Sequence, residues 1–249
     1  MSKTKRLRIF AGPNGSGKST LFTNISNTFP TGPFINADLI EALISSTGFL
    51  NLSEYGLTLT QEQFDEFCRL PTAVSLLEKA IEAGSPIDIL VRENVIVDKS
   101  KNTHSYQASL ITSFLRYYIT RKGVSYSFES VMSHPSKLEE IQAANDQGYK
   151  SYLYFICLDD PTLNISRVNN RVEKGGHAVP DQKIIDRYRR VLELLLPALS
   201  ICNKAYLFDN SSAEMKLIAK VKDGKLTILV NENELPNWFI ESVINKSIE

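Results

Sequence analysis

A glycine-rich segment near the start of the chain carries residue types that bind phosphate. Residues 12–19 read GPNGSGKS and match the pattern G-x-x-x-x-G-K-[ST]. Glycines let successive backbone N–H groups turn inward around an anion, Lys18 adds a cation at the β- and γ-phosphates, and the Ser19 hydroxyl is a ligand for Mg²⁺. The sequence therefore predicts a nucleotide-binding P-loop. We expect its ligands to be Gly12, Pro13, Asn14, Gly15, Ser16, Gly17, Lys18, Ser19 and Thr20.

Two carboxylates follow predicted strands and are candidates for the chemistry at this phosphate. Asp38 comes directly after a short strand at 33–36, whose carboxyl end should face the same crevice as the P-loop. A kinase needs such a carboxylate to orient or deprotonate the acceptor hydroxyl. Asp38 is equally well placed as a plain helix N-cap. Glu129 ends a strand at 124–128 and could bind substrate or Mg²⁺, or lie in solvent.

Arginines in the second half of the chain are candidate phosphate ligands. Arg167 and Arg171 are spaced i, i+4 on one predicted helix, so both can lean toward one ligand, although such a pair is also common on a solvated surface. The following Gly175-Gly176-His177 predicts a mobile loop that could close these cations over the phosphates. A dense basic cluster at Arg187, Arg189 and Arg190 fits the same lid.

The elements that position these residues alternate between strands and helices. Strands are expected at 7–10, 33–36, 124–128, 149–158 and 205–208. Helices are expected at 18–27, from 108 to an end at Gly123, at 135–147 and at 181–202, the last interrupted at Pro197. Such alternation with short turns predicts right-handed βαβ units around a mostly parallel sheet. The fold class is therefore α/β, a P-loop NTPase three-layer sandwich with flanking helices.

We expect one domain over residues 1–249, with two additions to the core pattern. Residues 47–100 read as a small helical insertion, with a capping box at Thr60-x-x-Gln63 and a possible hairpin turning near Glu93-Asn94. Residues 213–249 read as a β-hairpin, turning at Asp223-Gly224, followed by a helix.

Composition narrows the class of protein. The 249 residues include 28 Lys+Arg against 28 Asp+Glu, so no overall positive field draws in nucleic acid or an anionic membrane. Three widely spaced cysteines form no metal-ligand pattern and are expected to be reduced thiols. No signal peptide or membrane span is evident, so we expect a cytoplasmic protein.

The motifs taken together resemble the zeta-toxin family of P-loop kinases. The resemblance is carried by GPNGSGKST, FINAD, FESVMSHPSK, RVNNRVEKGGHAVP, RYRR and YLFDNS, in this order, and covers most of residues 7–212. Characterised members phosphorylate the sugar of UDP-N-acetylglucosamine or related UDP-sugars with ATP. The GGHAVP segment is more similar to the stand-alone chromosomal branch, and any neutralising antitoxin would be a separate chain.

The resemblance implies roles for individual residues. Asp38 matches the carboxylate that activates the sugar hydroxyl, and Glu129 and Ser133 match substrate-binding residues. Arg167 and Arg171 match the lid cations at the γ-phosphate. Asp209-Asn210 matches the region near the nucleotide base. The implied cofactors are ATP and Mg²⁺, with Ser19 as the metal ligand.

Alternative functions remain open at this point. Related P-loop folds include nucleoside and polynucleotide kinases, although the neutral charge argues against a nucleic-acid substrate. A different class is an ATP-binding switch or interaction protein with little transferase activity, in which residues 47–100 would form a partner surface. Replacing Asp38 separates a kinase from a switch, because only a kinase needs that carboxylate for transfer.

Overall fold

The computed structural model describes residues 4–100, 102–173, 175, 176 and 178–248. His177, expected in the loop after the arginine-bearing helix, lies outside the described residues. The chain divides into two compact units. The P-loop unit comprises Met1–Thr31 and Ser127–Glu249, and the 32–126 unit comprises Gly32–Tyr126. One domain over 1–249 stays a prediction.

The P-loop unit is built on a mixed β-sheet in which the strands nearest the site are parallel. Its strands follow the order β10-β9-β8-β7-β1-β6. β7 pairs parallel with both β1 and β8, whereas β9 runs antiparallel to β8 and to β10. The bounds are β1 (Arg6–Ala11), β6 (Tyr126–Ser130), β7 (Lys150–Cys157), β8 (Lys204–Asp209), β9 (Lys216–Lys222) and β10 (Lys225–Ile228). The mostly parallel core and the C-terminal hairpin predicted from the sequence are confirmed.

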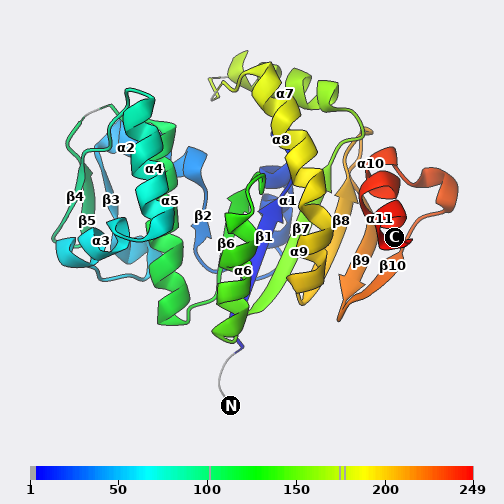
Figure 1. The fold of residues 1–249 in the computed structure, drawn as a ribbon, viewed down its shortest axis with the longest axis horizontal. Coiled ribbons are helices and arrows are strands. Elements are labelled where there is room, and N and C mark those ends of the chain that lie inside the picture. The colour runs from blue at the N-terminus through cyan, green and yellow to red at the C-terminus, as the bar shows by residue number, and fades with distance from the viewer. Residues whose placement is uncertain (1–3, 101, 174, 177, 249) are drawn as a thin grey trace. The chain divides into compact units, whose positions relative to one another are not determined.

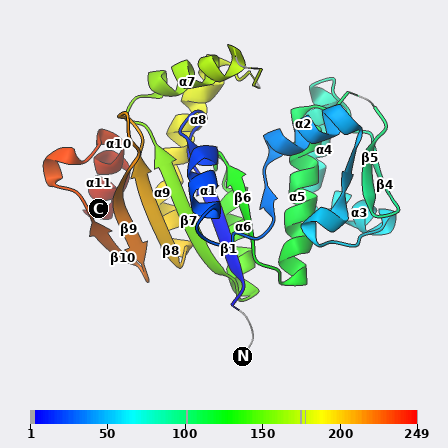
Figure 2. The same cartoon turned by 180° about the vertical axis from the view of Figure 1, so that it is seen from behind.

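Helices cover both faces of this sheet. Figures 1 and 2 show α1 on one face and α6 and α9 on the other, and α6 and α9 contact each other. The helix predicted over 181–202 is two helices that meet at Leu194, not at Pro197. Pro197 lies in the first turn of the second helix, where its missing N–H costs nothing. The bounds are α1 (Lys18–Ser26), α6 (Ser136–Asp146), α7 (Pro161–Glu173), α8 (Asp181–Glu193) and α9 (Leu195–Ile201).

The C-terminal segment belongs to the core of the P-loop unit. It comprises the 3₁₀ turn η2 (Glu232–Glu234), α10 (Asn237–Phe239), the π-helical turn η3 (Ile240–Ile244) and α11 (Asn245–Ile248). The Trp238 ring is 2% exposed and lies 5.6 Å, centroid to centroid, from the Phe155 ring of β7. The segment therefore packs on the central strands.

The 32–126 unit has its own small antiparallel sheet, in the order β3-β5-β4. The segment expected as an insertion, 47–100, contains helices and the expected hairpin, and β3 adds a third strand to that hairpin. Glu93 and Asn94 both have positive φ (52° and 63°), as a tight hairpin turn requires, and the Thr60–Gln63 capping box is present. The bounds are β2 (Phe34–Ile35), α2 (Ala37–Thr47), β3 (Phe49–Asn51), η1 (Leu52–Tyr55), α3 (Gln61–Cys68), α4 (Pro71–Glu82), β4 (Ile89–Arg92), β5 (Val95–Asp98) and α5 (Ser105–Lys122).

The cysteines and the helices can be described in the same terms as the composition. Cys68, Cys157 and Cys202 are free cysteines. Burial raises the pKa of Cys68 to about 11, with a smaller contribution from Asp65, and raises that of Cys202 to about 12. Among the described residues, no helix combines the length and apolar character needed to cross a membrane.

Candidate phosphate-binding and phosphotransfer site

The P-loop connects the carboxyl end of β1 to the first residue of α1. Gly12, Gly15 and Gly17 have φ values of 143°, 72° and 101°, a region that side chains disfavour. A Cβ on Gly12 would overlap the carbonyl of Ile156 in β7, so this position also needs glycine for space. Gly17 caps α1 without a side-chain hydrogen bond. Gly17 therefore offers no side-chain acceptor that would compete with an anion for the first N–H groups of the helix.

Lys18 folds back over the loop that it follows. Its side chain is 6% exposed, and Nζ donates hydrogen bonds to the carbonyls of Gly12 (3.1 Å) and Pro13 (2.8 Å). The ammonium group is thus held at the P-loop, where a phosphate would meet it.

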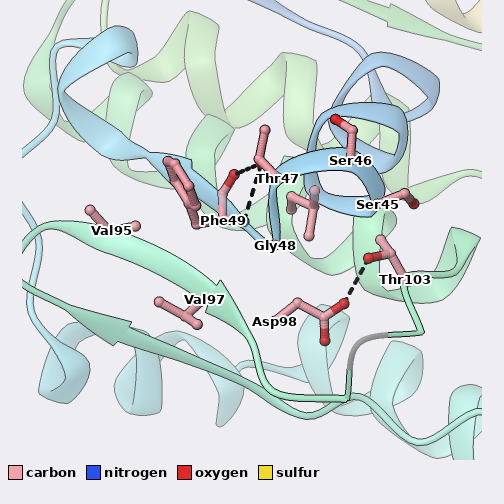
Figure 3. Close-up of a pocket in the computed structure, with 10 residues that line it drawn as sticks. Ser45, Ser46, Thr47, Gly48, Phe49, Val95, Val97, Asp98 and Thr103 are labelled. Carbon is pink, nitrogen blue, oxygen red and sulfur yellow. Dashed lines mark hydrogen bonds between the residues drawn. The ribbon is translucent and has the colours of Figure 1, made fainter.

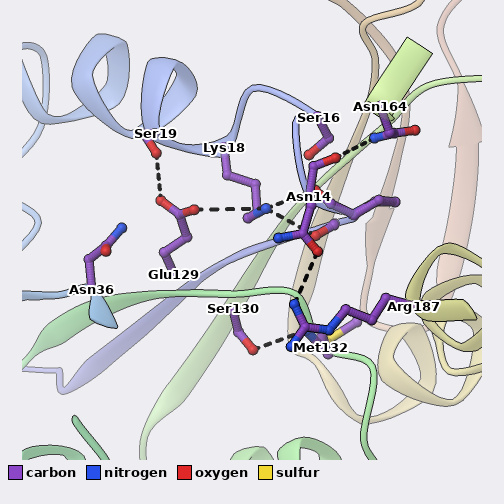
Figure 4. A network of polar contacts seen from close by, with 12 residues as sticks. Asn14, Ser16, Lys18, Ser19, Asn36, Glu129, Ser130, Met132, Asn164 and Arg187 are labelled. Atoms are coloured by element: carbon purple, nitrogen blue, oxygen red, sulfur yellow. Dashed lines mark hydrogen bonds and ion pairs between the residues drawn. The ribbon is translucent and has the colours of Figure 1, made fainter. Parts of the chain in front are cut away.

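Glu129, at the end of β6, reaches the two P-loop side chains that carry the predicted chemistry. Its Oε2 accepts a hydrogen bond from Ser19 Oγ at 2.8 Å, and its Oε1 lies 3.8 Å from Lys18 Nζ (Figure 4). The carboxylate is mostly buried, with 16% of the side chain exposed. This arrangement places a negative charge beside the hydroxyl predicted to bind Mg²⁺.

Three side chains from other elements contact the outside of the P-loop. Asn164 of α7 donates from Nδ2 to the carbonyl of Asn14 at 2.6 Å, and Asn210 Nδ2 donates to the carbonyl of Ser16 at 2.8 Å. Arg187 of α8 donates from Nη1 to Asn14 Oδ1 at 3.4 Å (Figure 4). The sequence interpretation missed Asn164 and assigned Arg187 only to a basic cluster. Asn164 could have been found from its spacing, because Asn164, Arg167 and Arg171 lie three and four residues apart on α7.

The two predicted lid arginines, Arg167 and Arg171, differ in burial and in the groups they contact. Arg167 is half-buried, and its Nη2 donates to the backbone carbonyl of Asn210 at 2.9 Å. Arg171 is exposed, and its side chain lies close to Gly176. Arg167 therefore contacts Asn210, whose side chain in turn contacts the P-loop, whereas Arg171 lies toward the surface of α7.

The stretch after β6 carries the other predicted substrate residue. Met132 is buried with φ of 56°, an unusual backbone conformation for a large side chain, and its N–H donates to Ser130 Oγ at 3.0 Å. Ser133 follows as a half-buried residue. The strained backbone between Glu129 and Ser133 is typical of functional segments.

Asp38 lies in the 32–126 unit, in the first turn of α2. The N-cap of that helix is Asn36, whose Oδ1 accepts from the N–H of Leu39 at 3.1 Å. The alternative reading of Asp38 as the cap is therefore wrong, because a different residue does this work. Its catalytic role stays a prediction.

Asp209 and Asp159, at the ends of β8 and β7, bind the C-terminal segment. Asp209 Oδ1 accepts from Trp238 Nε1 at 3.0 Å, and the two oxygens of Asp159 accept from the N–H of Trp238 and from Asn237 Nδ2, both at 2.9 Å. Because Asn210 is the next residue after Asp209, the C-terminal segment supports the backbone from which Asn210 reaches the P-loop.

An open pocket of ≈ 720 Å³ lies wholly within the 32–126 unit (Figure 3). Its lining combines apolar side chains such as Phe49 and Val97 with Asp98 and Thr103. Asp98 accepts hydrogen bonds from Ser100 Oγ (2.6 Å) and Thr103 Oγ1 (2.7 Å). The carboxylate therefore serves first to fix the segment after β5.

The residues present fit a magnesium nucleotide. The glycine cradle excludes side chains, the helix start is uncapped by a side chain, and Lys18 and Ser19 follow directly. Within the described ranges, no group of three or more His, Cys, Asp or Glu side chains could form a separate metal site. A metal at this site would therefore depend on Ser19, with Glu129 beside it.

Comparison with known proteins supports the fold rather than a specific activity. No family model matches the chain. A protein of Haemophilus influenzae, described only as uncharacterized, is 24% identical over 74 residues, which are 30% of this chain and 53% of the relative. The chain thus spans about half the length of the curated relative that it matches.

Similar solved structures cover nearly the whole chain. The AvrRxo1-ORF1:-ORF2 structure with ATP is 14% identical at a TM-score of 0.55, over 91% of this chain and 61% of that one. A structure from the PezAT chromosomal toxin-antitoxin system of Streptococcus pneumoniae is 14% identical at a TM-score of 0.52, over 98% of this chain and 80% of that one. The chain therefore shares the fold of these two solved structures.

Proposed function

We propose that the protein is an ATP-dependent kinase that transfers the γ-phosphoryl group of MgATP to a hydroxyl of a small molecule. The observation that carries this proposal is the P-loop itself, in which Lys18 is held at the loop and Ser19 Oγ lies 2.8 Å from Glu129 Oε2. ATP as the donor is supported by the similar AvrRxo1 structure, which was solved with ATP.

The proposed acceptor is a UDP-N-acetyl sugar. Support comes from the resemblance of FINAD and FESVMSHPSK to the acceptor side of zeta-toxin kinases, together with the shared fold. In this proposal Asp38, Glu129 and Ser133 bind the acceptor. A protein partner that neutralises the kinase belongs to the same proposal, since the similar PezAT structure belongs to a toxin-antitoxin system.

The proposed reaction is a direct in-line transfer. The acceptor hydroxyl oxygen forms a bond to the γ-phosphorus while the bond from that phosphorus to the β,γ-bridging oxygen breaks, and ADP leaves. Asp38 orients the hydroxyl and takes its proton. Lys18, Arg171 and Arg187 stabilise the negative charge on the transferred group, and Arg167 contributes to binding of the ATP phosphates. Mg²⁺, held through Ser19, would neutralise charge on the β- and γ-phosphates.

The test is mass spectrometry of UDP-sugars and nucleosides incubated with MgATP and the purified protein. We expect one UDP-sugar to gain the mass of one phosphate. Asp38→Asn should lower the transfer rate roughly 10²- to 10⁴-fold, the range for a lost general base, while ATP affinity stays nearly constant. Asp88→Asn is the matched control, because Asp88 forms only an exposed ion pair with Lys99.

Other outcomes would redirect the assignment. Phosphate on a nucleoside would favour a nucleoside kinase and exclude the UDP-sugar. ATP binding without any phosphorylated acceptor, unchanged by Asp38→Asn, would favour an ATP-dependent switch protein.

A further inference from the structure

The orientation of the P-loop peptide groups is fixed from outside by two asparagine side chains. Asn164 Nδ2 binds the carbonyl of Asn14 at 2.6 Å, and Asn210 Nδ2 binds the carbonyl of Ser16 at 2.8 Å. These contacts join residues 150 and 194 positions apart in the chain. We call Asn164 and Asn210 the asparagine pair.

Holding a carbonyl also sets the direction of the next N–H group. In a trans peptide the C=O of one residue and the N–H of the following residue point to opposite sides. The described peptide bonds include none that is cis. With the carbonyls of Asn14 and Ser16 turned outward to the asparagine pair, the N–H groups of Gly15 and Gly17 turn the other way.

These two N–H groups are the donors that a phosphate needs. Within the described part of the chain, neither Gly15 nor Gly17 donates its N–H to a protein acceptor. Both glycines have positive φ, so the backbone would readily take other orientations without an outside contact. The hydrogen bonds from the asparagine pair oppose that freedom.

Both asparagines are themselves held firmly. Asn164 is fully buried on α7, which fixes its side chain by packing. The N–H of Asn210 donates to the carbonyl of Cys157 at 2.9 Å, and the carbonyl of Asn210 accepts from Arg167 Nη2 at 2.9 Å. A Cβ on Gly17 would lie 2.6 Å from Asn210 Nδ2, so the two residues are in close contact.

We propose that Asn164 and Asn210 are positioning residues that set the P-loop N–H groups of Gly15 and Gly17 for phosphate. This inference rests on the proposed nucleotide-binding function and assigns Asn210 to the phosphates rather than to the nucleotide base. The pair acts through the backbone and does not itself touch the phosphate.

The experiment compares two ligands in titration calorimetry. Wild-type protein, Asn164→Ala and Asn210→Ala are each titrated with MgATP and with magnesium tripolyphosphate, which has the phosphates but no base. Losing one hydrogen bond that orients the loop should weaken both ligands by the same factor, roughly three- to tenfold. In turnover assays the KM for ATP should rise by a similar factor, with kcat changed less.

The matched control is Asn169→Ala, an exposed residue on the same helix that should leave both affinities unchanged. Thermal unfolding without ligand checks that each variant is folded. If Asn164→Ala does not fold, Asn210→Ala still decides the question, because Asn210 is only half-buried.

Each outcome has one meaning. An equal loss for both ligands supports the asparagine pair as positioning residues. A loss for MgATP alone would overturn the proposal and return Asn210 to the base site, and unchanged affinities would overturn it as well. If wild-type protein binds neither ligand, the proposed function itself fails, which is a separate result.

Discussion

Ser19 and Glu129 are hydrogen-bonded to each other in the P-loop unit, with 2.8 Å between Ser19 Oγ and Glu129 Oε2. The other carboxylate oxygen lies 3.8 Å from Lys18 Nζ. One carboxylate therefore lies beside both Lys18 and Ser19, the two P-loop side chains that the proposed function assigns to the nucleotide. Binding of a magnesium nucleotide has to exchange these contacts for contacts with the metal and the phosphates.

Glu129→Gln should make the proposed kinase depend more strongly on magnesium. The amide keeps the shape and can still accept from Ser19, but it removes the negative charge beside the proposed metal ligand. We expect kcat to fall roughly 10²-fold, as for loss of one charged group in a site of this kind. The Mg²⁺ concentration for half-maximal rate should also rise. Measuring the rate of ADP release across a magnesium titration gives both kcat and the Mg²⁺ concentration for half-maximal rate.

Glu139→Gln is the control for that variant, since Glu139 is an exposed carboxylate on α6. An unchanged magnesium dependence in Glu129→Gln would mean that Glu129 acts only on the acceptor, the role implied by the family resemblance.

Arg187→Ala should damage transfer more than Arg167→Ala. Arg187 reaches the P-loop side chain of Asn14 from α8, whereas Arg167 is engaged with a backbone carbonyl. Lys183 and Arg190 interact electrostatically with Arg187 or lie near it: the pKa of Lys183 is lowered, first by burial and then by Arg187 and Arg190. We expect a loss of about 10³-fold in kcat for Arg187→Ala, by analogy with arginines that stabilise phosphoryl transfer.

For Arg167→Ala we expect mainly a higher KM for ATP, measured in the same assay. Arg189→Ala is the control, because Arg189 is an exposed residue of α8. Equal losses in kcat for Arg167→Ala and Arg187→Ala would contradict the prediction that Arg187 matters more for transfer.

Asp98 should stabilise the folded protein at neutral pH and lose this stabilising effect in acid. Burial alone would raise its pKa, but the hydrogen bonds from Ser100 and Thr103 outweigh burial and hold the pKa below its usual value. A carboxylate with a lowered folded-state pKa stabilises the fold above its unfolded pKa, near 3.9, and loses this effect as the pH falls through the folded-state pKa. Asp98→Asn should cost about 1–3 kcal/mol at pH 7, with a smaller difference at pH 3.

Urea unfolding of wild-type protein and Asp98→Asn at several pH values measures this difference. Asp88→Asn again serves as the control, because its ion pair with Lys99 is exposed and should contribute less than about 1 kcal/mol. A difference that stays constant from pH 7 to pH 3 would show that the carboxylate charge is not what stabilises the segment.

The P-loop was predictable because its signal is local. Eight consecutive residues fix the turn, the cation and the hydroxyl, and the flanking strand and helix follow from hydrophobic spacing. The turn at Glu93-Asn94 and the Thr60–Gln63 capping box were predictable for the same reason, since each depends on residues at most three apart.

The contacts around the P-loop were not predictable in this way. Arg187 and Asn14 are 173 positions apart, and Asn210 and Ser16 are 194 apart. These side chains meet because β7 pairs with β1 and β8 pairs with β7 in the folded sheet. The strand at Phe49–Asn51 in the insertion was not predicted, because it has three residues and its partner, β5, begins only at Val95. So short a strand has almost no alternation to detect.

Trp238 gives the protein a built-in optical reporter. It is the only tryptophan in the sequence, it is buried, and its indole N–H is bound to Asp209, the neighbour of the residue that holds Ser16. Indole emission is sensitive to its hydrogen bonding and surroundings, so tryptophan fluorescence, excited apart from the tyrosines, reports on the contact between Trp238 and Asp209. Stopped-flow mixing with nucleotide could then follow rearrangements of this region in real time, without an attached dye.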